Sequence, residues 1–162
     1  MDIIVNVTEN WGIGHNGKLL YNIPADLKRF RELTIGRVVV LGRKTLYTFP
    51  GKKPLKGRTN LILSHQPGLQ IEGATVVNDI THLLTELQQY DSNDISVIGG
   101  ESIYRMLLPY CDKAYITRTY ARPEADSYFP NLDMSPQWRQ TDISEMYEFE
   151  KLTYRYINYV RV

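Results

Sequence analysis

Short runs of aliphatic and β-branched residues recur along the chain, separated by segments with the apolar spacing of helices. The runs predict strands over residues 2–7, 37–41, 60–64, 74–77, 95–98 and 114–119. Helices are predicted between them over residues 24–33, 80–89 and 102–108, with a short helix from Arg43. This alternation predicts an α/β fold with a mixed, mostly parallel central sheet flanked by helices.

The C-terminal part has a different pattern. Residues 138–143 and 151–162 both have strand character, and no helix is predicted between them. Leu152, Tyr154 and Tyr156 occupy alternate positions, which is the period of two of an antiparallel strand. The sheet is therefore expected to end in a C-terminal antiparallel hairpin.

Composition narrows the class of protein. A chain of 162 residues without internal repeat or linker fits one domain over residues 1–162. Its 43% hydrophobic and 23% charged residues are typical of a soluble globular protein. The formal net charge of +1 gives no general field for nucleic acid or an anionic membrane, so we expect small-molecule partners. We also expect a monomer.

The single cysteine bears on the compartment. Cys111 has no second cysteine to pair with and no Cys/His cluster around it, so we expect neither an internal disulfide nor a metal site. The apolar stretch at residues 3–5 is too short for a signal sequence, and no apolar run approaches a membrane span. We therefore expect a cytoplasmic protein.

One carboxylate stands out in the first predicted helix. Asn22 is a candidate N-cap for this helix, and Pro24 suits its first turn. Asp26, Phe30 and Leu33 fall at i, i+4 and i+7, so an acid shares a face with apolar side chains. Either Asp26 only complements the helix dipole, or it faces a planar ligand that offers two N–H groups.

Two glycine-containing segments each join a predicted strand to a helix. In residues 38–45, Gly42 precedes two cations and a hydroxyl, which outlines a phosphate site, although solvated basic residues are the more common reading. In residues 97–104, paired glycines could let a pyrophosphate approach the backbone or could form an ordinary tight turn. Neither segment has the P-loop or the Rossmann glycine pattern.

Two further segments carry candidate polar groups. Arg58 at the start of one strand could fork to a carboxylate, and His65 follows the same strand, although both are also ordinary surface residues. Residues 11–18 form a glycine-rich stretch after the first strand, which we expect to be a loop that can close over a site.

Together these segments resemble the dihydrofolate reductase family over nearly the whole chain. The family's landmarks occur in the family's order, and they are Ile13-Gly14, residues 22–27, residues 42–45, residues 57–60, residues 98–100 and Phe129-Pro130. The resemblance implies an oxidoreductase that reduces 7,8-dihydrofolate to 5,6,7,8-tetrahydrofolate, with hydride from NADPH and protonation of N5, in support of one-carbon metabolism. Antifolate inhibitors are the other ligands that it implies.

The resemblance also implies roles for individual residues. Asp26 would bind the pterin N3 and 2-amino groups and promote protonation of N5. Arg58 would pair with the α-carboxylate of the glutamate tail, and Thr117 would help to hold Asp26. The substrate-binding residues would be Ile4, Tyr21, Leu27, Phe30, Leu55, Arg58 and Thr117. The cofactor-binding residues would be Asn6, Ile13, Gly14, Lys18, Gly42, Arg43, Lys44, Thr45, Ser64, His65, Ile98, Gly99, Gly100, Glu101, Ser102, Ile103 and Tyr104.

Some details of the resemblance are specific to this chain. Gly99 and Gly100 are joined by a cis peptide in the family. Tyr21 follows a leucine where many members have Pro-Trp, and it keeps an aromatic ring with a hydroxyl that can hold a water. Asn6 stands where a small apolar residue is common, close to the expected pterin.

Two other functions remain open from the residues. A related reductase acting on a ribosylated pyrimidine would share the fold and the nicotinamide cofactor, although Asp26 and Arg58 argue against it. A nucleotide-binding module without catalysis would need only a phosphate-binding turn. Oxidation of NADPH with and without dihydrofolate separates the three functions.

Overall fold

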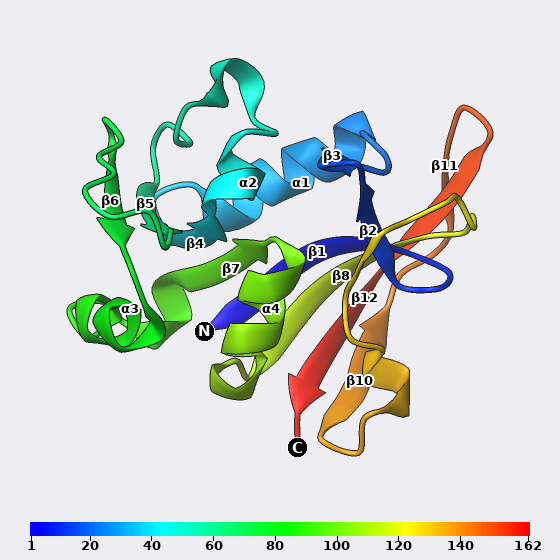
Figure 1. The fold of residues 1–162 in the computed structure, drawn as a ribbon. Helices are drawn as coiled ribbons and strands as arrows, with labels where there is room; N and C mark the ends of the chain where they lie inside the picture. The colour runs from blue at the N-terminus through cyan, green and yellow to red at the C-terminus, as the bar shows by residue number, and fades with distance from the viewer.

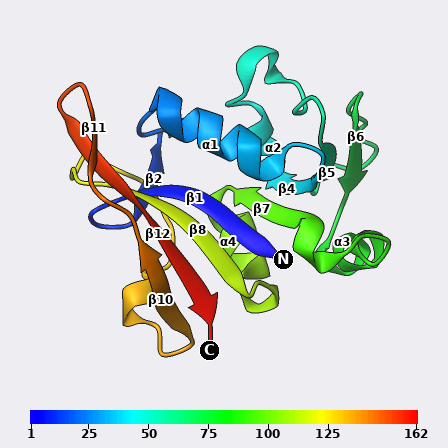
Figure 2. The same ribbon diagram turned by 180° about the vertical axis from the view of Figure 1, so that it is seen from behind.

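A nine-stranded sheet forms the centre of the structure, a computed structural model that describes residues 1–162 (Figure 1). Its strands are β1 (Asp2–Thr8), β4 (Val38–Gly42), β5 (Thr59–Leu63), β6 (Ala74–Val77), β7 (Ile95–Gly99), β8 (Lys113–Thr119), β10 (Trp138–Ile143), β11 (Tyr147–Phe149) and β12 (Leu152–Arg161). They lie in the order β10-β12-β8-β1-β7-β4-β5-β6, and β11 pairs with β12. Figure 2 shows β10 and β12 at one edge of the sheet and β6 at the other.

The strand directions confirm the predicted mixed sheet. The strands from β8 to β6 in this order pair in parallel, whereas β12 is antiparallel to β8, β10 and β11. Each predicted strand agrees with the structure to within one residue at either end, and within this main sheet only the short β11 is not predicted. The period of two in the C-terminal segment therefore marked a real antiparallel strand.

Four helices connect the strands. They are α1 (Pro24–Thr34), α2 (Arg43–Leu46), α3 (Ile80–Leu87) and α4 (Glu101–Leu107), and the short 3-10 turns are η1 (Pro50–Lys52), η2 (Ser92–Asp94), η3 (Leu108–Tyr110) and η4 (Leu132–Met134). None of the helices has both the length and the apolar character that a membrane crossing requires.

The predicted Asn22 cap of α1 is wrong. The N-cap residue is Ile23, which is extended (φ −104°, ψ 116°) and makes no side-chain capping hydrogen bond. The proline ring of Pro24 disfavours a helical conformation for the residue before it, so the boundary falls at Ile23 instead of Asn22. Pro24 itself stands in the first turn, as predicted, where its missing N–H costs nothing.

Alternate side chains of the central strands belong to two separate hydrophobic cores, one on each face of the sheet. In β4, Val38 and Val40 belong to a large core together with side chains of α3 and α4. Val39 and Leu41 belong to a smaller core together with Leu46 of α2, and Phe30 of α1 packs against it. Figure 1 shows the same division, with α1 and α2 on one side of the sheet and α4 on the other. Helices therefore cover both faces, as parallel strands require.

A second, three-stranded sheet corrects the prediction of a loop at residues 11–18. Within this segment β2 (Gly12–His15) pairs antiparallel with β3 (Lys18–Leu19) and with the distant β9 (Ser127–Tyr128). The Asp126 carboxylate accepts a hydrogen bond of 2.9 Å from the Asn16 amide. The glycines of β2 hide the alternation of side chains that marks a strand. Its partner β9 lies more than a hundred residues away, so the sequence does not reveal the pairing of β2 with β9.

The carboxyl ends of three parallel strands meet at one edge of the main sheet. β4 ends at Gly42, β7 ends at Gly99, and Ser64 follows the end of β5. In open α/β sheets this is the edge at which ligands bind. The segments singled out from the sequence are therefore gathered there by the topology of the sheet.

Candidate active site

A cleft of about 1110 Å³ opens at this edge, between α1 and α2 on one side and α4 and the small sheet on the other. Every site residue predicted from the sequence lines the cleft, except Gly42. A volume at the upper end of the range for single ligands leaves room for two molecules side by side. The structure thus brings together residues from both halves of the chain.

Gly42 lies behind the cleft and does not line it. It ends β4 and forms the N-cap of α2, and a Cβ atom placed on it would come within 3.1 Å of the Ile103 side chain. The cleft lining gives no support to the predicted contact between Gly42 and a cofactor. The glycine is needed because α4 packs closely against the end of β4.

Asp26 is held at one end of the cleft by two side chains of the main sheet. Thr117 of β8 donates its hydroxyl hydrogen to Oδ1 at 2.5 Å, and Asn6 of β1 donates from Nδ2 to Oδ2 at 3.0 Å. Asn6 and Thr117 are register partners on neighbouring parallel strands, so their side chains project from the same face. The carboxylate is paired with no cation, so it keeps its capacity to accept further hydrogen bonds.

A tyrosine and an arginine complete the surroundings of Asp26. Tyr156 of β12 is the register partner of Thr117, and the Arg29 guanidinium of α1 lies 4.1 Å from the centre of its ring. Burial, followed by the negative charge of Asp26, raises the pKa of Tyr156 to about 12. Tyr156 is therefore neutral at physiological pH and adds no second negative charge beside Asp26.

Two arginines line the cleft near the end of α1. Arg58 donates from Nε to Thr34 Oγ1 at 3.1 Å and from Nη1 to the Lys56 carbonyl at 2.7 Å, and its Nη2 has no protein acceptor. Burial and the charge of Arg31 lower the pKa of Arg58, and no acid is paired with either arginine. Two uncompensated cations in one corner favour an anionic ligand group there.

Glycines line the middle of the cleft where β7 meets α4. The Gly99–Gly100 peptide is cis, as the resemblance implied, and Gly99 has φ 123°. A Cβ atom on Gly99 would come within 3.3 Å of the Tyr104 ring, and one on Gly100 within 3.3 Å of Thr45 Oγ1. A side chain at either position would be crowded, and the bare backbone of the two glycines lets a ligand approach the main chain closely.

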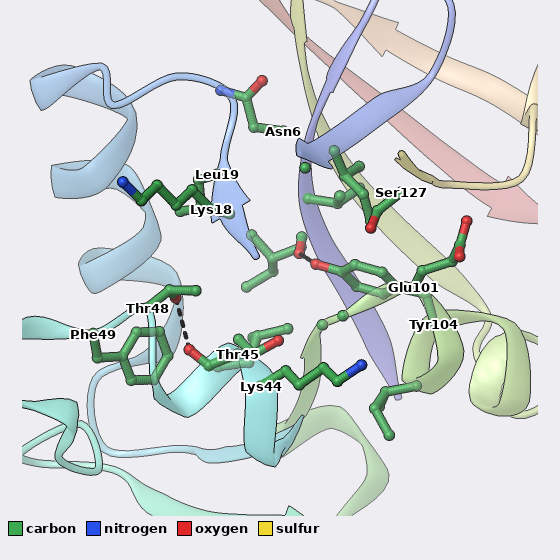
Figure 3. A pocket seen from close by; sticks show the side chains of 18 of the residues that line it. Asn6, Lys18, Leu19, Lys44, Thr45, Thr48, Phe49, Glu101, Tyr104 and Ser127 are labelled. Carbon is green, nitrogen blue, oxygen red and sulfur yellow. Dashed lines mark hydrogen bonds between the residues drawn. The ribbon is translucent and has the colours of Figure 1, made fainter. Parts of the chain in front are cut away.

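Tyr104 links α4 to the first strand beneath the glycines. Its hydroxyl donates to the Ile4 carbonyl at 2.8 Å, and complete burial raises its pKa, so that it remains a donor. Figure 3 shows Tyr104 and Glu101 of α4 facing the same hollow as Lys44 and Thr45 of α2. The floor of the cleft is therefore fixed to β1.

Basic and hydroxyl side chains surround the start of α2. Arg43 donates to Gln66 Oε1 at 2.6 Å, Lys44 is exposed, and neither is paired with an acid. Ser64 and His65 line the same part of the cleft. Unpaired cations beside a glycine-lined slot fit a nucleotide cofactor that carries an extra phosphate. The residues present thus match the requirements of NADPH.

The cleft also contains residues that were not predicted. They are Val5, Thr8, Gly12, His15, Gly17, Leu19, Leu20, Asn22, Ile23, Arg31, Thr48, Phe49, Pro50, Leu63, Gln66, Met106 and Ser127. Several stand next to predicted residues, and Met106 lies one turn of α4 beyond Ile103, so spacing could have identified them. Ser127 belongs to β9, and no local pattern connects it to the cleft.

The fold and the cleft together define a class of protein. An acceptor carboxylate, a cationic corner and a glycine-lined nucleotide slot share one cleft at the carboxyl edge of a mixed α/β sheet. A nucleotide cofactor and a second, planar ligand can lie side by side there. This is the site of a nicotinamide-dependent reductase.

Comparison with known proteins identifies the family. The family model described as dihydrofolate reductase matches residues 1–161. The dihydrofolate reductase of Mycobacterium leprae is 39% identical over 125 residues, which are 75% of this chain and 74% of that protein. The dihydrofolate reductase type 3 of Salmonella typhimurium is 32% identical over 144 residues, which are 89% of this chain and 86% of that protein. The structure of dihydrofolate reductase from Enterococcus faecalis complexed with NADP(H) and RAB-propyl has a TM-score of 0.86 and 32% identity, covering 99% of this chain and 95% of that one.

The chain belongs to the dihydrofolate reductase family. It is an NADPH-dependent oxidoreductase of the kind that reduces dihydrofolate to tetrahydrofolate. The match over the whole chain argues against the two alternatives, a reductase of ribosylated pyrimidines and a binding module without catalysis.

Replacing both Arg43 and Lys44 with glutamine is expected to weaken NADPH binding and leave NADH binding little changed, because only NADPH carries the extra phosphate. Hydrogen bonds to charged groups contribute about 1.5–3 kcal/mol each, so the loss should exceed tenfold at about 25 °C. Titration of both cofactors checks this, with Lys113→Gln/Lys151→Gln as a control that removes two exposed cations outside the cleft. An equal loss of affinity for NADPH and NADH would show that these cations do not bind the extra phosphate.

Proposed function

We propose that this chain reduces 7,8-dihydrofolate to 5,6,7,8-tetrahydrofolate with Asp26 as the carboxylate that binds the pterin and promotes protonation at N5. The two oxygens of Asp26, each already holding one hydrogen bond from the sheet, are the observation that carries the proposal. The other acid in the cleft, Glu101, already accepts from the Tyr128 amide at 2.7 Å and lies 3.7 Å from Arg105. Asp26 is thus the acid available to the substrate.

The chemistry follows from the charge and shape of Asp26. An ionised carboxylate offers two parallel acceptors, which match the N3–H and 2-amino groups of a pterin. Its negative charge stabilises the pterin that gains a proton at N5, which is the change that accompanies reduction. Bound NADPH supplies the hydride. The residues that would hold NADPH are those of the glycine-lined slot and the basic start of α2.

Apolar side chains form the walls around the reacting groups. Ile4, Leu27, Phe30 and Ile98 line the cleft, and Leu27 is 50% exposed. An exposed leucine facing a cleft gains free energy when a flat ring covers it. We assign these side chains to the pterin and nicotinamide rings, from which they exclude water and so strengthen the electrostatic effect of Asp26.

Arg58 and Arg31 form a cationic corner of the cleft that can bind the glutamate tail of the substrate. The free Nη2 of Arg58 and the nearby Arg31 can receive a carboxylate of the substrate tail, and Leu55 lines the same cleft. A related pyrimidine substrate with a ribose would not use this corner. Antifolates that carry paired N–H groups would compete for Asp26 itself.

We also propose that the chain acts as a monomer in a reducing compartment such as the cytoplasm. The cleft is complete within one chain, and the single Cys111 is buried, where burial raises its pKa to about 12. A thiol in that state is unreactive at physiological pH. A sedimentation mass of twice 18.8 kDa would contradict the monomer.

Arg58→Leu is expected to weaken dihydrofolate binding far more than binding of a pterin that lacks the glutamate tail, because only the former offers a carboxylate. A charge-assisted pair contributes about 1.5–3 kcal/mol, so the loss for dihydrofolate should be at least tenfold. Lys53→Leu is the matched control, since Lys53 is exposed and lies outside the cleft. If the two ligands weaken alike in Arg58→Leu, its role is structural.

Asp26→Asn is expected to reduce activity at neutral pH by about 10²–10⁴-fold with NADPH binding nearly intact, because the charge that favours N5 protonation is gone. Lowering the pH should restore part of the activity, since the solution then supplies substrate already protonated at N5. The measurement is kcat/KM against pH for both proteins, with Asp142→Asn as the exposed control. Near-normal activity of Asp26→Asn at neutral pH would contradict the catalytic role and leave Asp26 only the role of stabilising the helix dipole of α1.

A further inference from the structure

The side chain of Asn6 is the middle member of a hydrogen-bonded chain that ends on Asp26. Its Nδ2 donates to Asp26 Oδ2 at 3.0 Å, and its Oδ1 accepts from the Thr119 hydroxyl at 3.0 Å. Thr119 is fully buried, and its side chain makes no other hydrogen bond. These hydrogen bonds therefore connect the catalytic carboxylate to a buried side chain of β8.

The orientation of the Asn6 amide follows from its partners. An ionised carboxylate can only accept hydrogen bonds, so the amide must turn its NH₂ group toward Asp26 and its oxygen away. The Thr119 hydroxyl then donates to that oxygen, so both ends of the amide are satisfied. A reversed amide would set two oxygens against each other at Asp26, so the orientation is fixed.

This fixed amide restricts a torsion that is otherwise soft. The terminal torsion of an aspartate is broad and has two-fold character, so a carboxylate held at one oxygen can still rotate. Here Thr117 holds Oδ1 and Asn6 holds Oδ2, one donor on each oxygen. Each oxygen keeps a second lone pair, and the two free lone pairs lie in the same fixed plane.

We propose that Asn6 is a positioning residue for the catalytic carboxylate, which, with Thr119 behind it, sets the plane of Asp26 so that both oxygens meet the paired N–H groups of the pterin. The proposal rests on the role proposed for Asp26. A small apolar residue, common at this position in the family that the sequence resembles, would leave Oδ2 without this donor. The resemblance places Asn6 among the cofactor-binding residues, and both polar atoms of its side chain are already engaged, one by Asp26 and the other by Thr119.

Asn6→Ala tests the role directly. With the donor to Oδ2 removed, we expect kcat/KM for dihydrofolate to fall about tenfold, the effect of one hydrogen bond to a charged group. Folate affinity should fall by a similar factor, whereas a 2-desamino analogue of folate, which lacks the amino group that pairs with the carboxylate, should bind both proteins to within about twofold. NADPH affinity should not change. Asn131→Ala, which removes an amide that caps η4 outside the cleft, is the matched control.

Thr119→Val provides a second, independent variant. Valine has the shape of threonine but cannot hold the Asn6 amide, so kcat/KM should fall about threefold in the wild-type background and not at all in Asn6→Ala. The double variant Asn6→Ala/Thr119→Val also removes the hydroxyl that the single Asn6 variant leaves buried without a partner. It keeps the test valid if Asn6→Ala folds poorly.

The outcomes separate the two proposals when Asp26→Asn is measured beside these variants. Loss of activity in Asp26→Asn together with unchanged kcat/KM and folate affinity in Asn6→Ala would overturn the positioning role alone. Equal weakening of folate, its 2-desamino analogue and NADPH would also overturn it, because a general loosening of the fold then explains the loss. Full activity of Asp26→Asn would overturn the role of Asp26 and, with it, that of Asn6.

Discussion

An ionised carboxylate beside the apolar walls of a cleft is the constraint on which the rest of the structure depends. A charge in such a place is costly unless hydrogen bonds compensate for the lost water. The main sheet meets this requirement through the register of β1, β8 and β12, which sets Asn6, Thr117 and Tyr156 in a row facing the start of α1. Pro24 fixes where α1 begins and therefore where Asp26 stands along that row. A shift of one residue in β1 or β8 would turn Asn6 or Thr117 to the opposite face and remove one of the two donors to the carboxylate.

The same constraint explains how the cleft is divided. No cation is paired with Asp26, and the cations that line the cleft include Arg58 and Arg31 near the end of α1 and Arg43 at the start of α2. A cation paired with Asp26 would occupy the acceptor oxygens that a ligand with N–H donors needs. Between these ends the backbone at Gly99 and Gly100 is bare, so a nucleotide can pass close to the sheet. Charge separation within one cleft thus assigns each end to a different ligand group.

The sequence predicted the parts of this arrangement that have a local signal. The central strands are buried on both faces and are rich in β-branched residues, so their positions were predicted almost to the residue. The small sheet was missed because β2 contains two glycines and its partner β9 has only two residues. The sequence predicts Gly42 in the cleft because a glycine before two cations resembles a phosphate turn. In the structure, the close packing of the Ile103 side chain explains why a glycine stands at this position. The hydrogen bond from Asn6 to Asp26 and the position of Tyr156 beside Thr117 depend on strand register, which no local pattern expresses, so only the structure shows them.

A crystal structure of the chain with NADP⁺ and folate at atomic resolution is the most direct test of the central claim. We expect the pterin N3 and 2-amino nitrogens to lie within hydrogen-bond distance of the two Asp26 oxygens, about 2.7–3.0 Å, while Thr117 and Asn6 keep their own hydrogen bonds to the same oxygens. A pterin turned over in the cleft, or an Asp26 carboxylate that leaves Asn6 and Thr117 to reach it, would contradict the claim that the sheet sets the plane of the carboxylate before the substrate binds.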